Sequence, residues 1–339
     1  MISEFFTGSY AKEDEEGITR FEIDLKTGKL SKRYSYQGIE NPSYLLADKE
    51  RQILYAVEER TPEGFLHVLE IKEDRLIPVK KLSTHGADPC HLALSEDKTI
   101  LIAANYTSGS LIFYPLDPSG IPKEKGTLIE HRGKGKDPVR QEGPHVHFNK
   151  VKDGIVYTVD LGMDQIVLYK IDPDMEKLTD TGKKISFPAG SGPRHLVFPE
   201  QNADEMYAVC ELSNETAWIR KTGDDWKIMQ MLSMLPEDFK GQNTAAAIRE
   251  TGKYILTSSR GYDGLTSFLR KPEGNLRKIQ SIHLKGKIPR DFEVFGKWIV
   301  TADQGSDEIE ILSLDRKTGM MEKTGMGETV LRPTCICRI

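Results

Sequence analysis

Residues 89–116 read PCHLALSEDKTILIAANYTSGSLIFYPL, and this stretch decides the fold. It consists of three short apolar runs that are separated by polar turns. The runs are rich in Ile, Leu and Tyr, which are common in strands, while the turns carry Asp, Lys, Gly and Asn. The stretch therefore predicts three consecutive antiparallel strands that are joined by short turns.

The same pattern recurs along the chain at intervals of roughly 44 to 55 residues. Further copies begin at Pro42, Pro144, Pro193, Asn243 and Pro289. The two ends supply one more copy in two pieces, because 333–339 resembles a first strand and 4–25 resembles a second and a third. Pairing both ends in one blade is how a ring of blades avoids an open seam. The sequence thus predicts an all-β fold, a single seven-bladed β-propeller domain over residues 1–339, closed by its N- and C-terminal strands.

The outer parts of the repeats are more variable. The fourth strand of each blade is expected in segments such as 76–82, 183–187 and 277–284. The longest irregular stretch, 126–143, is rich in Gly, Lys and Arg, and we expect a functional loop there, with a solvated surface loop as the alternative. No segment shows sustained helical periodicity. The Gly-His and Trp-Asp pairs of WD40 propellers do not recur, since the chain contains only three tryptophans.

Composition favours a small-molecule partner. The net charge is −5 with both signs interspersed, and the isoelectric point is near 6.0, which argues against nucleic acid or an anionic membrane as partner. No apolar run approaches the roughly 20 residues that span a bilayer, and the first residues do not resemble a signal peptide. We expect a cytoplasmic protein, and a monomer or weak homodimer. The four dispersed cysteines predict buried packing rather than a disulfide framework or a zinc site.

Candidate functional residues lie in the loops of several repeats. In a propeller the first strand of every blade lines the central channel, so the loops that enter these strands meet at one mouth. Here those loops, and the loops after the second strands, carry histidines, arginines and acids that the repeat itself does not require. Convergence from distant parts of the chain is stronger evidence than any single residue. The candidates are His91, Arg140, His145, His147, Arg194, His195, Glu211, Arg260 and Arg290, with Asn105, Asp160 and Asp303 as further polar positions.

These residue types indicate a particular chemistry. Arginines beside histidines and carboxylates suggest an anionic ligand that is held by charged hydrogen bonds, with a histidine left for proton transfer. His145 and His147 are two residues apart on an entering strand, so we expect both to point to the same side. Structural roles are the alternative for His91 and His195. A mouth with more positive than negative charge would repel a cation, so we predict no metal, and no cofactor.

Several segments of the chain carry a family resemblance. They are GPRHLVF at 192–198 with YAVCEL at 207–212, RQEGPHVH at 140–147, VDLG at 159–162, LPEDF at 235–239, SSRG at 258–261 and IPRDF at 288–292. In their order along the chain these segments resemble the lactonase family of seven-bladed β-propellers, and the resemblance spans the whole chain. That family includes propeller-type 6-phosphogluconolactonases and fungal 3-carboxy-cis,cis-muconate lactonizing enzymes.

The resemblance implies a catalytic set, which consists of His147, Arg194, Glu211 and Arg260. His145 stays an alternative base, because the turn at 149–154 is shorter than is usual in the family. The implied reaction is hydrolysis of a sugar-acid lactone, with 6-phosphoglucono-δ-lactone of the pentose phosphate pathway as the first candidate. The small anionic lactone would be bound by the remaining candidates, which are His145, His195, Arg140, Arg290 and His91.

One segment departs from the family pattern. The strand after LPEDF usually reads Ala, an acid, Ile and His, whereas this chain has Ala246, Ala247, Ile248 and Arg249. The missing acid and histidine leave two alternatives to lactone hydrolysis open. One is a cycloisomerase that acts on a muconate-type dicarboxylate, and the other is a propeller that binds a partner without catalysis, because one fold hosts many functions.

Overall fold

The computed structural model describes residues 1–172, 177–200 and 202–339, and within them the long regular elements are all β-strands. These strands form seven sheets of four strands each, as the seven predicted blades require. The blades belong to two compact units, which are described separately. Unit 1 comprises 1–10, 18–34 and 194–338, and unit 2 comprises 11–17, 35–193 and 339. In the described ranges there is no helix with the length and apolarity that crossing a membrane requires.

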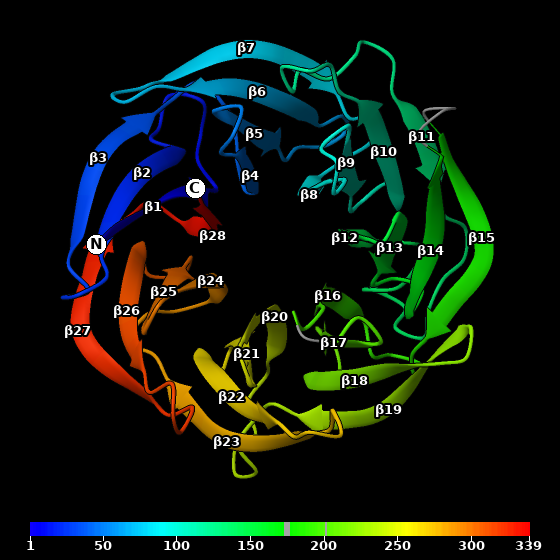
Figure 1. Ribbon diagram of the computed structural model, residues 1–339, viewed down its shortest axis with the longest axis vertical. Helices are drawn as coiled ribbons and strands as arrows, with labels where there is room; N and C mark the ends of the chain where they lie inside the picture. The colour runs from blue at the N-terminus through cyan, green and yellow to red at the C-terminus, as the bar shows by residue number, and fades with distance from the viewer. Residues whose placement is uncertain (173–176, 201) are drawn as a thin grey trace. The chain divides into compact units, whose positions relative to one another are not determined.

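Unit 2 holds three blades, each with its strands side by side in chain order (Figure 1). The first consists of β4 (Leu45–Asp48), β5 (Ile53–Glu58), β6 (Phe65–Ile71) and β7 (Leu76–Ser83). The second consists of β8 (Pro89–Leu94), β9 (Ile100–Asn105), β10 (Ser110–Pro115) and β11 (Thr127–Glu130). The third consists of β12 (Val146–Lys152), β13 (Ile155–Asp160), β14 (Gln165–Asp172) and β15 (Lys177–Ser186).

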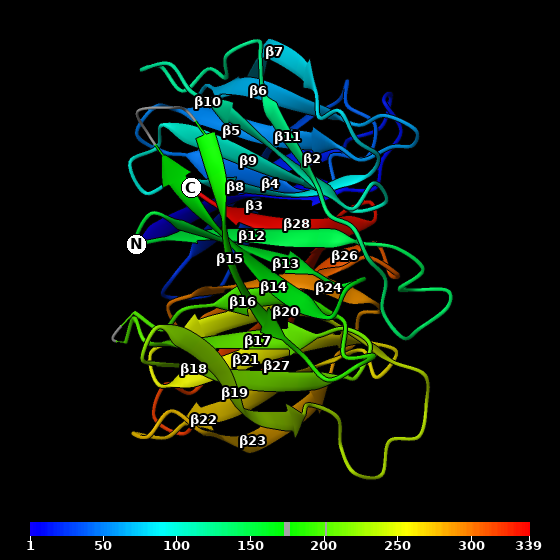
Figure 2. The ribbon, with the colours of Figure 1, turned by 90° about the vertical axis from the view of Figure 1, so that its right-hand side faces the viewer.

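Unit 1 holds the other four blades, and Figure 2 shows the strands of one of them, β16 to β19, edge to edge. That blade consists of β16 (Pro193–Val197), β17 (Glu205–Cys210), β18 (Glu215–Thr222) and β19 (Asp225–Ser233). The next consists of β20 (Thr244–Thr251), β21 (Tyr254–Arg260), β22 (Gly264–Arg270) and β23 (Leu276–His283). A third consists of β24 (Pro289–Phe295), β25 (Trp298–Asp303), β26 (Glu308–Leu314) and β27 (Met321–Thr329). The terminal blade consists of β28 (Pro333–Arg338), β1 (Ile2–Ser9), β2 (Ile18–Asp24) and β3 (Leu30–Tyr36).

The terminal blade confirms that the two ends of the chain share one sheet. β28 pairs antiparallel with β1, so that Ile336 lies opposite Thr7 and Cys337 lies opposite Phe6. In Figure 1 the red C-terminal strand lies beside the blue N-terminal one. The hydroxyl of Thr334 also donates to the Gly8 carbonyl at 3.1 Å. The C-terminal piece is therefore the first strand of this blade, as its sequence predicts.

Two of the three expected fourth strands were placed within one residue at each end, as β7 and β23, while β15 begins at Lys177 rather than at 183. The prediction that 126–143 is one irregular loop was wrong at its start. Residues Thr127–Glu130 form β11 and pair with β10, where Ile129 lies opposite Leu111. The Gly and Lys residues around this short strand hid it, because they dominate the composition of the segment.

Burial on both faces explains the apolar runs of the second strands. β5, β9, β17 and β25 are buried along their whole length, as strands covered on both sides are. In unit 2, Tyr55 of β5 shares a core cluster with Leu101 of β9. In unit 1, Val300 of β25 shares a cluster with Phe21 of β2. All four cysteines are buried, as predicted.

An aromatic hydrogen bond links several neighbouring blades. The hydroxyl of Tyr55 donates to the carbonyl of Gly120 at 2.6 Å, and that of Tyr207 donates to the carbonyl of Gly274 at 2.6 Å. Both tyrosines lie on a second strand, and both glycines lie in a turn of the following blade. Trp298 makes the same kind of contact, with the Leu25 carbonyl at 3.0 Å. These three buried donors each tie one blade to the next within its unit.

Candidate active site

Bulges interrupt the first strands where several candidate residues lie. In β12, Val146 pairs with Asp160 and Phe148 pairs with Val159, so His147 is an extra residue between them. The same irregularity in β24 falls at Arg290. A bulge bends the strand and re-aims the side chain of the extra residue. The alternation that predicted a common side for His145 and His147 therefore does not apply here, and their contacts show where the two rings lie.

Both histidine rings contact Tyr106, which directly follows β9. The ring of His145 stacks on Tyr106 with centroids 4.5 Å apart and planes 15° apart, while His147 meets the same ring at 5.6 Å and 79°. Arg140 donates to the Tyr106 hydroxyl at 3.4 Å. Tyr106 thus brings three of the predicted residues of unit 2 together, although the sequence analysis did not name it. A tyrosine after a strand has no distinctive pattern, so its place next to Asn105 was the one signal in the sequence, and it was too weak to single out Tyr106.

Both ring nitrogens of His145 lie near oxygen atoms. Nδ1 of His145 lies 3.1 Å from the carbonyl oxygen of Tyr106, and its Nε2 lies 3.3 Å from Oε1 of Glu142. A carbonyl oxygen and a carboxylate oxygen therefore lie next to the two nitrogens of this ring. The backbone N–H of Glu142, together with His145, lowers the pKa of the Glu142 carboxyl, although desolvation opposes the shift. Both histidine side chains are buried, with 5% of each residue exposed.

The irregular segment after β11 is anchored to the protein by one buried side chain. Gln141 is fully buried, and its Nε2 donates to the Leu161 carbonyl at 2.9 Å and to Oδ1 of Asp164 at 2.8 Å. Its Oε1 accepts from the backbone N–H groups of Lys136 and Asp137, each at 3.0 Å. This anchor fixes the segment that carries Arg140 and leads into β12.

In unit 1, two arginines share one carboxylate oxygen. Oε2 of Glu211, which follows β17, lies 2.9 Å from Nε of Arg194 and 2.9 Å from Nη2 of Arg260. Arg194 is the second residue of β16, and Arg260 is the last residue of β21. All three side chains are almost entirely buried, with 3% of Arg194, 5% of Glu211 and 13% of Arg260 exposed. Together the three groups sum to one positive charge, an arrangement suited to an additional anion.

Backbone carbonyls complete the environment of these arginines. Nη1 of Arg194 donates to the Ala246 carbonyl at 2.8 Å, and Nη2 of Arg260 donates to the Ala245 carbonyl at 2.9 Å. The register of β20 shifts between Ala245 and Ile248, which exposes these carbonyls to the arginines instead of to a strand partner. Nη1 of Arg194 also lies 3.1 Å from Nε2 of His195, so His195 accepts from the arginine. His195 is thereby in contact with Arg194, and its role in substrate binding stays a prediction.

The residues that depart from the family pattern have structural contacts. Ala247 is fully buried in the cluster between the β20–β23 and β24–β27 blades. Arg249 forms ion pairs with two acids of β24, through Nη2 to Asp291 at 2.7 Å and through Nε to Glu293 at 3.0 Å. Burial raises the pKa of Asp291, and Arg249 counteracts that shift. Arg249 therefore joins two blades with a charge that these carboxylates balance.

His91 lies in an aromatic stack. Its ring centroid is 4.3 Å from that of Tyr44 and 4.0 Å from that of Phe148, and its Nδ1 accepts from the Asn149 N–H at 3.3 Å. Only 3% of the residue is exposed. These contacts favour the structural alternative for His91, and its role in substrate binding stays a prediction. Arg290, by contrast, places its guanidinium 5.1 Å from the ring centroid of Tyr10 in unit 1.

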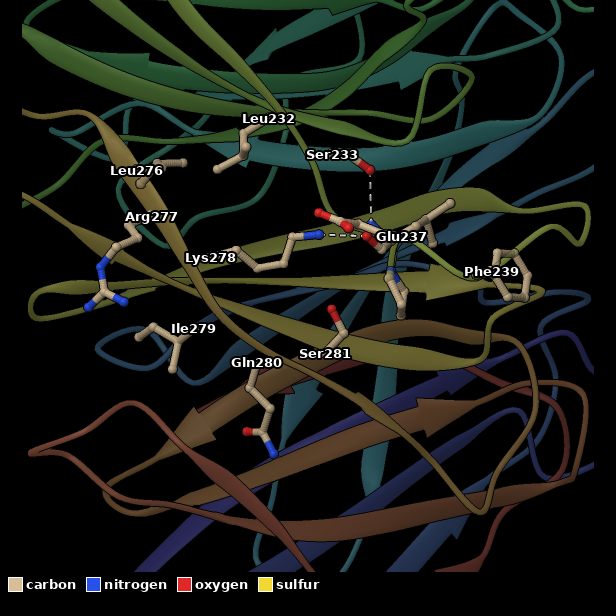
Figure 3. A pocket seen from close by; sticks show the side chains of 12 residues that line it. Leu232, Ser233, Glu237, Phe239, Leu276, Arg277, Lys278, Ile279, Gln280 and Ser281 are labelled. Carbon is tan, nitrogen blue, oxygen red and sulfur yellow. Dashed lines mark hydrogen bonds between the residues drawn. The ribbon is translucent and has the colours of Figure 1, made fainter.

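A surface groove lies away from these residues, along the outer strands of two blades of unit 1. It has a volume of about 900 Å³ and runs between the end of β19 and β23 (Figure 3). Nζ of Lys278 donates to the Leu235 carbonyl there, and burial lowers the pKa of the lysine. The lining residues include none of the predicted site residues; they are Leu232, Ser233, Leu235, Pro236, Glu237, Phe239, Leu276, Arg277, Lys278, Ile279, Gln280 and Ser281.

A protein-family model described as "Lactonase, 7-bladed beta-propeller" matches residues 4–337. The chain therefore belongs to this lactonase family, and its fold class is the seven-bladed β-propeller. Both the family resemblance of the sequence and the predicted fold are confirmed.

Individual relatives cover nearly the whole chain. The 6-phosphogluconolactonase of Bacillus subtilis (strain 168) is 29% identical over 344 residues, which are 98% of this chain and 97% of the relative. An uncharacterized protein of Lactococcus lactis, YwcC, is 30% identical over 330 residues, 95% of each chain. A proposed 6-phosphogluconolactonase from Bacteroides fragilis has a solved structure with a TM-score of 0.92 at 25% identity, covering 100% of this chain and 98% of that one. Family and relatives together support a lactonase.

Proposed function

We propose that this protein hydrolyses 6-phosphoglucono-δ-lactone to 6-phosphogluconate. The observation that carries the proposal is the buried group of Arg194, Glu211 and Arg260, whose charges sum to +1. Planar guanidinium groups match the oxygens of phosphate and carboxylate, so two guanidinium groups held by one carboxylate suit an anionic substrate. The relative in Bacillus subtilis that carries this enzyme name supports the choice of substrate. The partner is then a small anionic lactone.

In the proposed reaction His147 is the general base. It removes a proton from a water molecule whose oxygen forms a bond to the lactone carbonyl carbon. The tetrahedral intermediate then breaks the ring carbon–oxygen bond, and the protonated histidine returns its proton to the ring oxygen as this oxygen leaves. No other reactant is needed. We place the base at His147 because the family resemblance implies this residue, and His145 stays the alternative base.

The arginines bind or stabilise the negative charges of the substrate and of the intermediate. Arg194 and Arg260 bind the phosphate of the substrate or stabilise the oxyanion of the tetrahedral intermediate, and Glu211 holds both guanidinium groups in position. His195, which accepts from Nη1 of Arg194, restricts the orientation of that arginine further. We further propose that the protein acts in the cytoplasm, in carbohydrate metabolism.

A comparison of substrates tests this proposal. The assay measures the rates at which the protein hydrolyses freshly generated 6-phosphoglucono-δ-lactone and unphosphorylated glucono-δ-lactone. Both lactones are supplied at equal concentrations, and spontaneous hydrolysis is subtracted. Charged hydrogen bonds contribute about 1.5–3 kcal/mol, so kcat/KM should be about 10- to 100-fold higher for the phosphorylated lactone. Equal values would contradict the role of the arginines in phosphate binding. Turnover of a muconate-type dicarboxylate, with neither lactone hydrolysed, would replace the hydrolase by a cycloisomerase.

A further inference from the structure

A chain of three buried polar side chains connects the residue after β11 with the third blade of unit 2. Nε2 of His131, which follows β11, is 2.9 Å from the hydroxyl of Tyr169 on β14, and its Nδ1 is 2.6 Å from Oδ2 of Asp160 at the end of β13. Exposed fractions are 5% for Tyr169, 9% for His131 and 0% for Asp160. The ring centroids of His131 and Tyr169 lie 6.1 Å apart.

The protons of this chain can be assigned from its donors and acceptors. Burial raises the pKa of Tyr169, and the charges of Asp180 and Asp160 raise it further, so the hydroxyl keeps its proton. It donates a hydrogen bond to Nε2 of His131. The imidazole proton is then on Nδ1, which donates to Asp160. Tyr169 and His131 therefore orient one oxygen of the Asp160 carboxylate.

The second oxygen of Asp160 holds the segment that enters β12. Oδ1 accepts from the backbone N–H of His145 at 2.9 Å and from that of Met163 at 3.0 Å. The Leu161 N–H donates in turn to the His145 carbonyl at 2.9 Å. The turn after β13 also packs closely against the segment before β12, because a Cβ on Gly162 would lie 2.0 Å from the Gly143 carbonyl oxygen. Asp160 thus connects the buried chain to the backbone of His145.

We propose that His131 is a positioning residue, which acts through Asp160 to fix the backbone of His145 and thereby the packing of His145 and His147 on Tyr106. The three contacts that this requires are the bond from His131 to Asp160, the bond from the His145 N–H to Asp160, and the shared contact of both rings with Tyr106. The kinetic consequence rests on the proposed function, because it takes His147 to be the base. The effect on ring geometry does not.

Three substitutions separate positioning from simple loss of packing. His131→Leu removes the donor to Asp160, while His131→Asn keeps a donor nitrogen at the place of Nδ1 and loses the contact with Tyr169. His67→Leu is the matched control. His67 is also a buried histidine of unit 2, 2.6 Å from a buried carboxylate, that of Glu58, but it lies on β6 in another blade.

The first measurement is the kinetics of lactone hydrolysis. His131→Leu should lower kcat by about 10- to 100-fold with KM within about 3-fold of wild type, because a small misplacement of a reacting group costs that much. His131→Asn should restore kcat to within about 5-fold of wild type, and His67→Leu should leave it within about 3-fold. Equal losses in His131→Leu and His67→Leu, or a wild-type kcat in His131→Leu, would overturn the proposal.

The second measurement does not depend on activity. The carbon–proton NMR signals of the eight histidine rings are assigned by substitution and compared between the folded variants. Signals of His145 and His147 should move in His131→Leu and stay in place in His131→Asn and His67→Leu. If the wild type hydrolyses no lactone, the proposed function fails while this result still decides the positioning role. Unmoved His145 and His147 signals in a folded His131→Leu would refute it.

Discussion

Replacement of Glu211 by glutamine should destabilise the protein and make its stability depend on anions. Oε2 of Glu211 is 2.9 Å from a nitrogen of Arg194 and 2.9 Å from one of Arg260. With charge centres about 4 Å apart and an effective dielectric constant of about 20, each pair contributes roughly 4 kcal/mol before desolvation. Removing one partner of a buried pair typically costs about 3–5 kcal/mol, and we expect Glu211→Gln to lower the free energy of unfolding by this amount.

Urea denaturation with and without inorganic phosphate measures both effects. In Glu211→Gln the two arginines have lost their carboxylate, so phosphate should bind there more tightly than in the wild type. A ligand at 100 times its dissociation constant stabilises a protein by about 2.7 kcal/mol, which would restore most of the loss. Glu58→Gln is the control, because Glu58 is also a buried partner of cationic groups, at 2.7 Å from Lys81. Equal recovery of the two variants by phosphate, or a loss below about 1 kcal/mol in Glu211→Gln, would refute the reasoning.

Three further predictions concern stability. Burial acts to raise the pKa of Glu58, but hydrogen bonds from His67 and Lys81 outweigh it and lower the pKa from 4.5 to about 2. The stability that this group contributes should therefore be present above pH 4.5 and lost as the pH falls toward 2. Chemical denaturation across this pH range should show a smaller dependence of the unfolding free energy on pH in Glu58→Gln than in the wild type. Burial raises the pKa of Asp303 well above 3.8, so its contribution is present below that pH and is lost as the pH rises through the folded value. Asp303→Asn should therefore be more stable than wild type at pH 8, by about 1.4 kcal/mol per unit of the raised pKa, and a less stable variant at that pH would contradict a neutral Asp303. Tyr207→Phe should cost about 1–3 kcal/mol in urea denaturation because it leaves a buried carbonyl without its donor, and an unchanged midpoint would show that this link between blades is dispensable.

The fold was predictable because its determinants are local and repeated. Each blade needs only short apolar runs and turns, and the division of one blade between 4–25 and 333–339 shows in the same pattern. Errors occurred where a strand was short or its composition was dominated by its surroundings. Thr127–Glu130, four residues long with mostly exposed side chains, is the example.

The candidate site was predictable in its residue types but not in its contacts. The sequence placed Arg194, Glu211 and Arg260 in one group through the resemblance, and the structure joins them through a single carboxylate oxygen. It did not indicate Tyr106, because a tyrosine after a strand has no distinctive pattern. Nor did it indicate the bulge at His147, which depends on the pairing of β12 with β13 and not on the residue itself.

One experiment tests most directly whether this member of the lactonase family hydrolyses a lactone with His147 as the proposed base. Hydrolysis of freshly generated 6-phosphoglucono-δ-lactone, coupled to 6-phosphogluconate dehydrogenase and corrected for spontaneous hydrolysis, tests it in wild type, His147→Ala and His145→Ala. A positioned base contributes about 10²- to 10⁴-fold, so His147→Ala should lose activity by that factor with little change in its thermal midpoint, and His145→Ala should lose less. A wild type without activity would contradict the proposed lactone hydrolysis. A folded His147→Ala with wild-type kcat would contradict the role of His147 as the base.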